Sequence, residues 1–383
     1  MTGNALNVGI VGFGFIGKVH AFAHINMPLY YDPPPMRTKL FGVCTAHKET
    51  ARAAADKCGF ELATTDYGEL VEHPDIDIVH ICTPNACHKE QLLAALANNK
   101  HIYCDKPLVA SASEAHEIAD AMKTYTGTHQ MTFHNRFFPA TLKAKELADA
   151  GFLGDVLSFR AVYLHAGSAD PDAPLKWKLS KEQAGGGVLY DLGSHVIDLV
   201  RHLIGEFAEV NCATQIAFAD RPSLDDPGKR VPVEAEDAAC MLMRTASGAL
   251  GTIEATKIAT GAEDELRFEI HGTKGAMRFD LMKPNWLEVY DAADEDAGWK
   301  KIATVQRYAG PSGFMTPKAS IGWVRAHVAC LHNFLSAIAA GRPAEPGLET
   351  GVRVQEIMGA AYRSAESGSW TRSNLKIQDT NKS

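Results

Sequence analysis

Two residues that stand far apart in the sequence, Lys106 and His195, are of types that can move protons and stabilise charge. Lys106 belongs to the tripeptide Asp105-Lys106-Pro107, which directly follows the apolar run His101–Cys104, a predicted strand. A lysine at the carboxyl end of a strand can donate a hydrogen bond to a substrate oxygen and stabilise negative charge on it. Pro107 restricts the backbone immediately after the lysine. The alternative interpretation is a surface Lys-Pro turn without a chemical role.

His195 lies within the run Gly185–Asp198, at the start of a helix that we predict from about 187 to 204. Asp191, His195 and Asp198 are spaced i, i+4 and i+7, so they would share one face of that helix. A histidine beside a carboxylate suits a general base for a substrate hydroxyl, because its ordinary pKa is about 6.5. A structural Asp–His pair and a metal site are the alternatives. No further Cys or His stands at a suitable spacing, so we expect no metal.

A glycine-rich turn stands between the predicted strand Asn7–Val11 and a predicted helix. It reads Gly12-Phe13-Gly14-Phe15-Ile16-Gly17, with the spacing G-x-G-x-x-G. The first glycine allows a tight turn, the second lets the backbone approach a pyrophosphate, and the third lets helix and strand pack closely. The N-terminus of the helix then offers unpaired N–H groups to an anion. Such turns are common alone, but between a strand and a helix this one predicts dinucleotide binding.

The second predicted strand, Lys39–Cys44, should end beside the adenosine ribose, where Asp or Glu favours NAD by bonding the 2′-hydroxyl. It is followed instead by Thr45, Ala46 and His47, with neither an acid nor an arginine among them. Thr45 can bond a hydroxyl, and His47 could help to hold a phosphate. The cofactor is therefore NAD or NADP, with NAD favoured.

The third predicted strand, Ile76–Cys82, runs into Thr83-Pro84-Asn85. Ligands of open α/β sheets bind beyond the carboxyl ends of the strands, so these three residues should meet the dinucleotide. They can also form a turn that caps the next helix, and both roles can hold at once. His88 in that helix is a further candidate for cofactor contact. His20 and His24, in the first helix, are interpreted as packing or surface residues.

The order of elements predicts two domains, at 1–127 and 128–375. Residues 7–125 repeat a short apolar run followed by a helical stretch four times, which is typical of a doubly wound parallel sheet, the Rossmann arrangement. After about Gly127 long strand-like runs dominate, with turn signals such as Ser247-Gly248 between them. This pattern predicts an α+β domain with an open antiparallel sheet. Together they give an α/β fold of two domains.

The composition narrows the functional classes. The chain has 383 residues, 46% of them apolar and 22% charged, with a net charge of −8. An acidic chain without polybasic runs lacks the positive field that nucleic acid or anionic lipid requires. No apolar run approaches the length of a membrane span. The eight cysteines form no C-x-x-C pair, which predicts free thiols and a cytoplasmic protein.

The combination of motifs resembles the Gfo/Idh/MocA oxidoreductase family over nearly the whole chain. The resemblance rests on the glycine turn, on Cys82-Thr83-Pro84-Asn85, on Asp105-Lys106-Pro107 and on the run Gly185–Asp198. Each motif is weak alone, but the set is specific. The segment Gly322–His327 is similar to the levoglucosan and inositol dehydrogenase branch of that family.

The resemblance implies roles for particular residues. Lys106 would be the catalytic lysine and His195 the residue that transfers the proton, with Asp191 beside it in the substrate pocket. The second domain would form a homo-oligomer, a dimer or a tetramer. The chain departs from the family where Asp105 replaces the usual Glu, and where the acid after the second strand is missing.

Further residues would shape the pocket. Asn135 would contact the cofactor, and an aromatic wall with polar donors suits a sugar. The residues expected to contact substrate are Lys106, His134, Arg136, Tyr163, His165, Trp177, Asp191 and His195; Lys178 flanks them. The favoured function is an NAD(P)-dependent dehydrogenase for a secondary hydroxyl of a sugar, anhydrosugar or cyclitol. The alternatives are a glycoside-processing enzyme that holds and recycles its NAD, and a nucleotide-binding sensor without chemistry.

Overall fold

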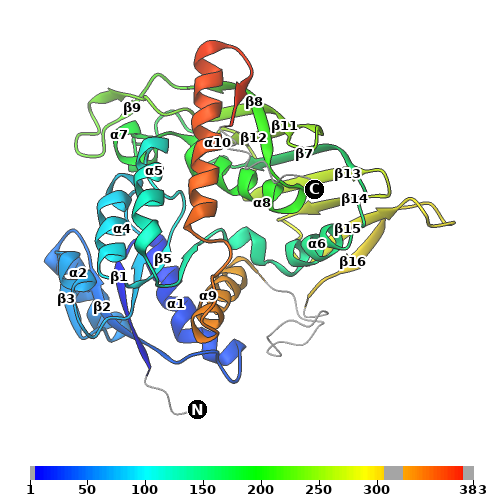
Figure 1. The fold of residues 1–383 in the computed structure, drawn as a ribbon. Helices are drawn as coiled ribbons and strands as arrows, with labels where there is room; N and C mark the ends of the chain where they lie inside the picture. The colour runs from blue at the N-terminus through cyan, green and yellow to red at the C-terminus, as the bar shows by residue number, and fades with distance from the viewer. Residues whose placement is uncertain (1–4, 306–321, 374–383) are drawn as a thin grey trace.

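The computed structural model describes residues 5–305 and 322–373, which form two sheets with helices around and between them (Figure 1). In this described part the first sheet has six strands, all parallel, in the order β3-β2-β1-β4-β5-β6. Helices on both faces bury the central strands, which explains their continuous apolar sequences. The strands are β1 (Leu6–Val11), β2 (Thr38–Cys44), β3 (Leu62–Thr64), β4 (Ile78–Ile81), β5 (His101–Cys104) and β6 (His129–Met131).

The predicted alternation of strands and helices is confirmed in this Rossmann domain. The short strand β3 was not predicted, and β6 pairs with β5 on the far side of the expected boundary at residue 127. The helical elements are α1 (Phe15–Tyr30), α2 (Lys48–Cys58), α3 (Gly68–Val71), η1 (Asn85–Cys87), α4 (His88–Ala97), α5 (Ala112–Ala121) and η2 (Met122–Thr124).

The second sheet has nine strands in the described ranges, in the order β16-β15-β14-β13-β7-β12-β11-β8-β17. It is open and antiparallel as expected, except that β7 pairs with β12 in parallel. Parallel strands need a long crossover connection, and the chain between Leu164 and Leu250 provides one. The strands are β7 (Val156–Leu164), β8 (Phe207–Gln215), β11 (Ala238–Thr245), β12 (Leu250–Thr256), β13 (Glu265–Gly272), β14 (Gly275–Asp280), β15 (Trp286–Asp291), β16 (Lys300–Ala303) and β17 (Thr371–Arg372), with the separate hairpin β9 (Asp220–Pro222) and β10 (Arg230–Pro232).

The helical elements of the second domain include a π-turn, η5, that runs directly into α8 where one regular helix was predicted. Residues 306–321, 374 and 375 of the expected second domain lie outside the described residues. The elements are η3 (His134–Phe137), α6 (Pro139–Asp149), η4 (Trp177–Leu179), α7 (Lys181–Ala184), η5 (Leu189–Gly193), α8 (Ser194–Ile204), α9 (Trp323–Ala339) and α10 (Leu348–Ser367).

The two C-terminal helices return to the first domain, so the core is continuous across both. In Figure 1 α9 lies beside α1, and its residues Leu331 and Phe334 share one apolar cluster with Ile10 of β1. Figure 1 also shows α10 standing between α5 and the second sheet, and it contacts both α5 and β8. This packing fixes the position of one sheet relative to the other, and with it the cavity between them. Within the described residues, no helix combines the length and the apolar character needed to cross a membrane.

Candidate active site

A cavity of about 1060 Å³ opens at the carboxyl ends of the first sheet's strands. Val11, Cys44 and Cys82, at the ends of β1, β2 and β4, line it from the first domain. Tyr163 and His195 line it from the second domain. Ordinary ligand pockets measure roughly 300–1,000 Å³, so this cavity has room for a large cofactor together with a small substrate.

The glycine turn forms one wall of the cavity. Gly12 has a φ of +89°, and a Cβ there would lie 2.6 Å from the carbonyl oxygen of Cys82. A Cβ on Gly17 would lie 2.1 Å from the carbonyl oxygen of Gly12, so the third glycine is required for helix packing. Gly14 instead faces open space, with no atom within 4 Å of the position of a Cβ. Its backbone and the uncapped start of α1 are thus free to approach an anion.

The end of β2 supplies hydroxyl groups to the cavity. Thr45 and Thr50 both line it, and their hydroxyls are 2.6 Å apart. Ala46 lines the cavity as well, whereas His47 is exposed and is not among the lining residues. Among the described residues that line this end, none carries a carboxylate. A ribose would therefore meet neutral hydroxyls here.

The loop after β4 joins the two domains beside the cavity. Asn85 lines the cavity and donates a hydrogen bond to the carbonyl oxygen of Ala184, 2.8 Å away in α7. Thr83 lines it too and donates to Gln91 at 2.7 Å. His88 does not line the cavity, since its ring bonds the carbonyl oxygens of Thr83, Pro107 and Leu108 at 2.9–3.1 Å. It holds the loops after β4 and β5 together.

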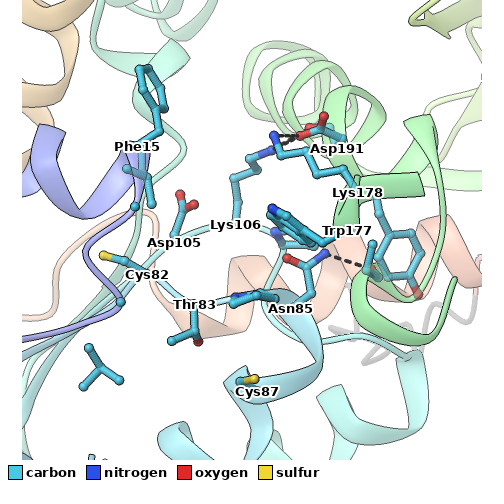
Figure 2. Close-up of a pocket in the computed structure, with 18 of the residues that line it drawn as sticks. Phe15, Cys82, Thr83, Asn85, Cys87, Asp105, Lys106, Trp177, Lys178 and Asp191 are labelled. Atoms are coloured by element: carbon cyan, nitrogen blue, oxygen red, sulfur yellow. Dashed lines mark hydrogen bonds and ion pairs between the residues drawn. The ribbon is translucent and has the colours of Figure 1, made fainter. Parts of the chain in front are cut away.

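Lys106 of the first domain and Asp191 of the second domain form an ion pair beside the cavity (Figure 2). The Lys106 ammonium lies 2.6 Å from the Asp191 carbonyl oxygen and 3.1 Å from its Oδ1. Lys178 reaches the same Oδ1 at 2.8 Å, and Lys257 lies 3.3 Å from Oδ2. One carboxylate therefore faces three ammonium groups, and the cluster carries a net positive charge.

This cluster changes the acidity of its members. Burial opposes ionisation of Asp191, but the charges of Lys106, Lys257 and Lys178 outweigh it and hold its pKa well below the ordinary value. Burial lowers the pKa of Lys106, and Asp191 opposes that decrease. The pKa of Lys178 is raised, because attraction to Asp191 exceeds the cost of burial. Asp191 remains ionised and holds the lysines in place.

His195 enters the cavity just after the π-turn η5, the second residue of α8. Burial lowers its pKa well below the ordinary value, and the charge of Lys106 lowers it further. The imidazole is therefore neutral near pH 7 and able to accept a proton. Its Nδ1 is buried without a hydrogen-bond partner in the described part of the chain. Asp191 lines the same cavity, where its carboxylate is bonded to Lys106 and Lys178, and its charge opposes the decrease in the pKa of His195.

The remaining wall is aromatic with polar tips. Asp264 accepts hydrogen bonds from the Tyr163 hydroxyl at 2.7 Å and from the ring of His165 at 2.9 Å. All three line the cavity, as do Trp177 and Trp323. Burial opposes ionisation of Asp264, but its two hydrogen bonds lower its pKa, so a carboxylate faces the cavity. Such a wall offers ring faces for an apolar surface and acceptors for hydroxyls.

Both domains match known family models. Residues 6–133 match a model described as an oxidoreductase family, NAD-binding Rossmann fold. Residues 145–372 match the model for the same family's C-terminal alpha/beta domain. The chain belongs to the Gfo/Idh/MocA oxidoreductase family. The resemblance inferred from the motifs is thereby confirmed, and with it an oxidoreductase with an NAD-binding domain.

Individual relatives lie within this family. The chain is 36% identical to levoglucosan dehydrogenase from Pseudarthrobacter phenanthrenivorans, over 95% of this chain and 97% of that protein. It is 28% identical to inositol 2-dehydrogenase from Rhizobium meliloti, over 93% and 96% of the two chains. A solved levoglucosan dehydrogenase in complex with NADH and L-sorbose superposes with a TM-score of 0.93, at 37% identity, over 96% of this chain and 98% of the other.

Several residues predicted to bind ligand are not among those that line the cavity of this Gfo/Idh/MocA protein. They are Gly17, His47, His88, Asn135 and Arg136. Arg136 forms a buried pair with Asp198, with nitrogen–oxygen distances of 2.5 and 2.7 Å. Asp198 was expected on the face of Asp191 and His195. His195 and Asp198 both lie in the regular helix α8, but Asp198 is not among the residues that line the cavity, and its carboxylate is bound by Arg136 of η3.

Three functional candidates were missed from the sequence. Lys257 and Asp264 are the first and last residues of the connection between β12 and β13, and Trp323 begins α9. None lies within a motif of fixed spacing, although Trp323 is in the segment Gly322–His327 that resembles the family. The predicted Lys106, Asp191, His134, Tyr163, His165, Trp177 and His195 are brought together in one cavity. No group of metal-binding residues occurs within the described ranges.

Proposed function

We propose that this protein is an NAD-dependent dehydrogenase that oxidises a secondary hydroxyl of a sugar, an anhydrosugar such as levoglucosan, or a cyclitol. The observation that carries the proposal is the convergence of Lys106 from the first domain and His195 from the second on one cavity. That cavity also begins at the glycine turn. Membership in the oxidoreductase family and relatives named for anhydrosugar and inositol oxidation support the substrate class.

We infer that the glycine turn and the strand ends hold the cofactor. The open space at Gly14 and the uncapped start of α1 suit its pyrophosphate. When bound, NAD supplies the acceptor for the hydride of the carbinol carbon. The residues proposed to hold it are Gly12, Phe13, Gly14, Phe15, Ile16, Thr45, Ala46, Thr83, Pro84, Asn85, Asp105 and Lys106, all of which line the cavity.

The proton of the substrate hydroxyl passes to His195 in this mechanism. A neutral imidazole is the form that can accept it, and burial together with Lys106 keeps His195 neutral. Lys106 donates a hydrogen bond to the substrate oxygen and stabilises its developing negative charge. Asp191 positions Lys106 through two hydrogen bonds, and the net positive cluster favours the oxyanion further.

The second domain holds the sugar in this proposal. Asp264 and His165 accept and donate hydrogen bonds at the hydroxyl rim, and Trp177 covers a ring face. Tyr163 and His134 complete the wall. A site built to bond hydroxyls discriminates strongly against a substrate that lacks one, because its buried polar groups would then be unpaired.

A substrate screen tests the proposal. Sugars, anhydrosugars and inositols are supplied with NAD or with NADP, and reduced cofactor is followed by absorbance. Free NADH that accumulates with one of these polyols supports a dehydrogenase. Hydrolysis or rearrangement of a glycoside without net NADH would indicate a recycled cofactor, and no turnover of any polyol would overturn the proposal.

We also infer a homo-oligomer formed through the outer face of the second sheet, in a cytoplasmic protein. Leu242, Leu250 and Trp286 point outward on this face and are 43%, 43% and 41% exposed. Exposed apolar patches commonly mark interfaces. All eight cysteines are free, as a reducing compartment allows. Light scattering on the wild type and on Leu242→Glu tests the oligomer, and a monomeric wild type would contradict it.

A further inference from the structure

Six histidines form a continuous row through the interior, which we call the histidine row. The row begins at His195 in the cavity and ends near the surface beside Thr38. Its members come from α8, η3, α9, β4 and α1, so it crosses the boundary between the domains. Each ring is at least 95% buried, at 5% relative exposure or less. In order the row is His195, His134, His327, His20, His80 and His24.

The outer half of the row is joined by hydrogen bonds. Nδ1 of His20 lies 3.0 Å from Nδ1 of His80, and Nε2 of His80 lies 3.0 Å from Nε2 of His24. Nδ1 of His24 lies 2.9 Å from the Thr38 hydroxyl, which is partly exposed. His80 therefore bonds a histidine through each of its two ring nitrogens. This arrangement makes an unbroken path from His20 to solvent.

The inner half, from His195 to His20, is connected by ring contacts and contains nitrogens without hydrogen-bond partners among the described residues. His134 stacks on His327 with ring centroids 3.9 Å apart, and its edge meets the His195 ring at 5.1 Å. His327 and His20 are 6.5 Å apart. These four rings have five buried nitrogens without a partner among the described residues, two of them on His327. Unpaired buried polar groups are rare and call for an explanation, such as exchange of a proton or a bridging water.

The protonation state of the rings suits proton transfer. Burial lowers the pKa of His20 and His134 to about 4 and of His24 to about 3. Burial also lowers the pKa of His80 and His327 well below the ordinary value. A neutral imidazole has one N–H donor and one acceptor nitrogen, so it can take a proton at one side and release one at the other.

We propose that the histidine row conducts the proton released by substrate oxidation from His195 to solvent at Thr38. The proposal rests on the dehydrogenase function proposed above. In that reaction the carbinol carbon loses a hydride to NAD⁺, its hydroxyl loses a proton to His195, and a ketone and NADH form. His195 must release this proton before the next turnover. His134 and His327 receive it through water molecules that bridge the unpaired nitrogens of the inner half, and His20, His80 and His24 pass it along their hydrogen bonds to water beside the Thr38 hydroxyl.

Neither core packing nor metal binding fits the geometry of the row as well. Histidines that only fill the core would need no nitrogen-to-nitrogen contacts, and apolar rings would avoid the five unpaired nitrogens. A metal site requires nitrogens that converge on one point, whereas the nitrogens of the outer half meet in successive pairs and five of those in the inner half have no partner among the described residues. No group able to hold a metal is found among the described residues. Proton conduction accounts both for the pairing in the outer half and for the unpaired nitrogens in the inner half.

The test compares proton release with hydride transfer in a single turnover. Wild-type enzyme is mixed with NAD⁺ and the best polyol of the screen in weak buffer, with NADH and a pH indicator followed by stopped flow. In the wild type both signals should rise together. The rate of this common phase should depend non-linearly on the deuterium fraction of the solvent, because several protons move in the same step. His80→Phe and His24→Phe should slow the common phase at least tenfold and remove the curvature, with the KM for the polyol unchanged.

His332→Phe is the matched control, since His332 is also in α9 but stacks on Tyr31 outside the row, at 3.8 Å. It should retain the wild-type rate and curvature. If thermal melting shows that His80→Phe does not fold, His24→Phe and Thr38→Val at the outer end of the row provide the test of the relay. Wild-type rates and curvature in these outer variants, or a linear dependence in the wild type, would overturn the relay. A wild type that forms no NADH from any polyol would instead refute the dehydrogenase function.

Discussion

Lys106 is bonded by Asp191 through both the backbone oxygen, at 2.6 Å, and the carboxylate, at 3.1 Å. The two residues come from different domains, so the position of the ammonium depends on how those domains pack. A lysine side chain has four rotatable bonds, and two acceptors on one residue restrict it strongly. The active-site cation is therefore placed by the fold of the second domain as much as by its own strand.

Lys106→Met should lower kcat/KM by roughly 100- to 1,000-fold, the usual effect of removing one donor to a developing oxyanion. Binding of NADH should weaken far less than kcat/KM falls, because Lys106 is one of many residues proposed to hold the cofactor, and the glycine turn and the end of β2 are untouched. Steady-state kinetics and NADH fluorescence titration measure the two effects. Lys181→Met in α7 is the control, since that lysine is exposed and does not line the cavity. An unchanged kcat/KM in Lys106→Met would contradict the role of Lys106.

His195→Gln should reduce kcat by roughly 100- to 10,000-fold, which is the usual contribution of a general base. The KM for the polyol should rise less, because Asp264 and Trp177 still contact the substrate. The matched control is His202→Gln, which lies two turns later in the same helix and away from the cavity. Equal losses in both variants would indicate damage to α8 and not loss of a base.

Asp191→Asn should reduce both activity and stability. The substitution removes the carboxylate that pairs with Lys106, Lys178 and Lys257, and breaking a buried ion pair costs about 3–5 kcal/mol. Lys178 is about half exposed, so solvent offsets part of this cost and the lower end of the range is expected. Urea unfolding measures the loss. If activity fell while the free energy of unfolding stayed at the wild-type value, the carboxylate would act on substrate and not by holding the lysines.

The residues that sequence analysis found share a local signal. Lys106 follows a strand, and His195 lies in a glycine-led run, so strand ends and spacing were sufficient to predict them. Asp198 has the same kind of signal but pairs with Arg136. This partner is brought to Asp198 by the packing of η3 against α8, which cannot be read from spacing.

Lys257 and Asp264 show the other limit of sequence analysis. Asp264 lines the cavity and Lys257 lies 3.3 Å from the Asp191 carboxylate. Both positions depend on the pairing of β12 and β13 with β7, a strand about 90 positions earlier in the chain (Leu250 with Ser158). Likewise, α9 was predicted as a helix, but its packing against α1 and the first sheet depends on contacts between distant segments. His20 and His24 were interpreted as packing or surface residues, and the contact of both with His80 is apparent only in the folded structure.

Thr45→Asp should sharpen the preference for NAD over NADP by at least about tenfold. Thr45 lines the cavity just after β2, where a carboxylate bonds the ribose 2′-hydroxyl and repels a 2′-phosphate. The wild type, with neutral hydroxyls here, should show measurable turnover with NADP. Comparison of kcat/KM for the two cofactors in both proteins measures the change. A ratio unaffected by Thr45→Asp would place the adenosine ribose elsewhere.

Acid should destabilise the folded protein well above the pH at which carboxylates titrate. Burial lowers the pKa of His134 and His20 to about 4, whereas an unfolded histidine titrates near 6.5. Between these values the unfolded chain binds protons that the folded chain excludes, so stability is fully present above pH 6.5 and falls as the pH decreases. Each such histidine contributes up to about 1.4 kcal/mol per pH unit. His24→Phe should flatten the dependence of the unfolding free energy on pH by about one proton, because burial lowers the pKa of His24 to about 3. A wild-type unfolding free energy that is constant between about pH 6.5 and 4 would show that these rings are hydrated and not buried.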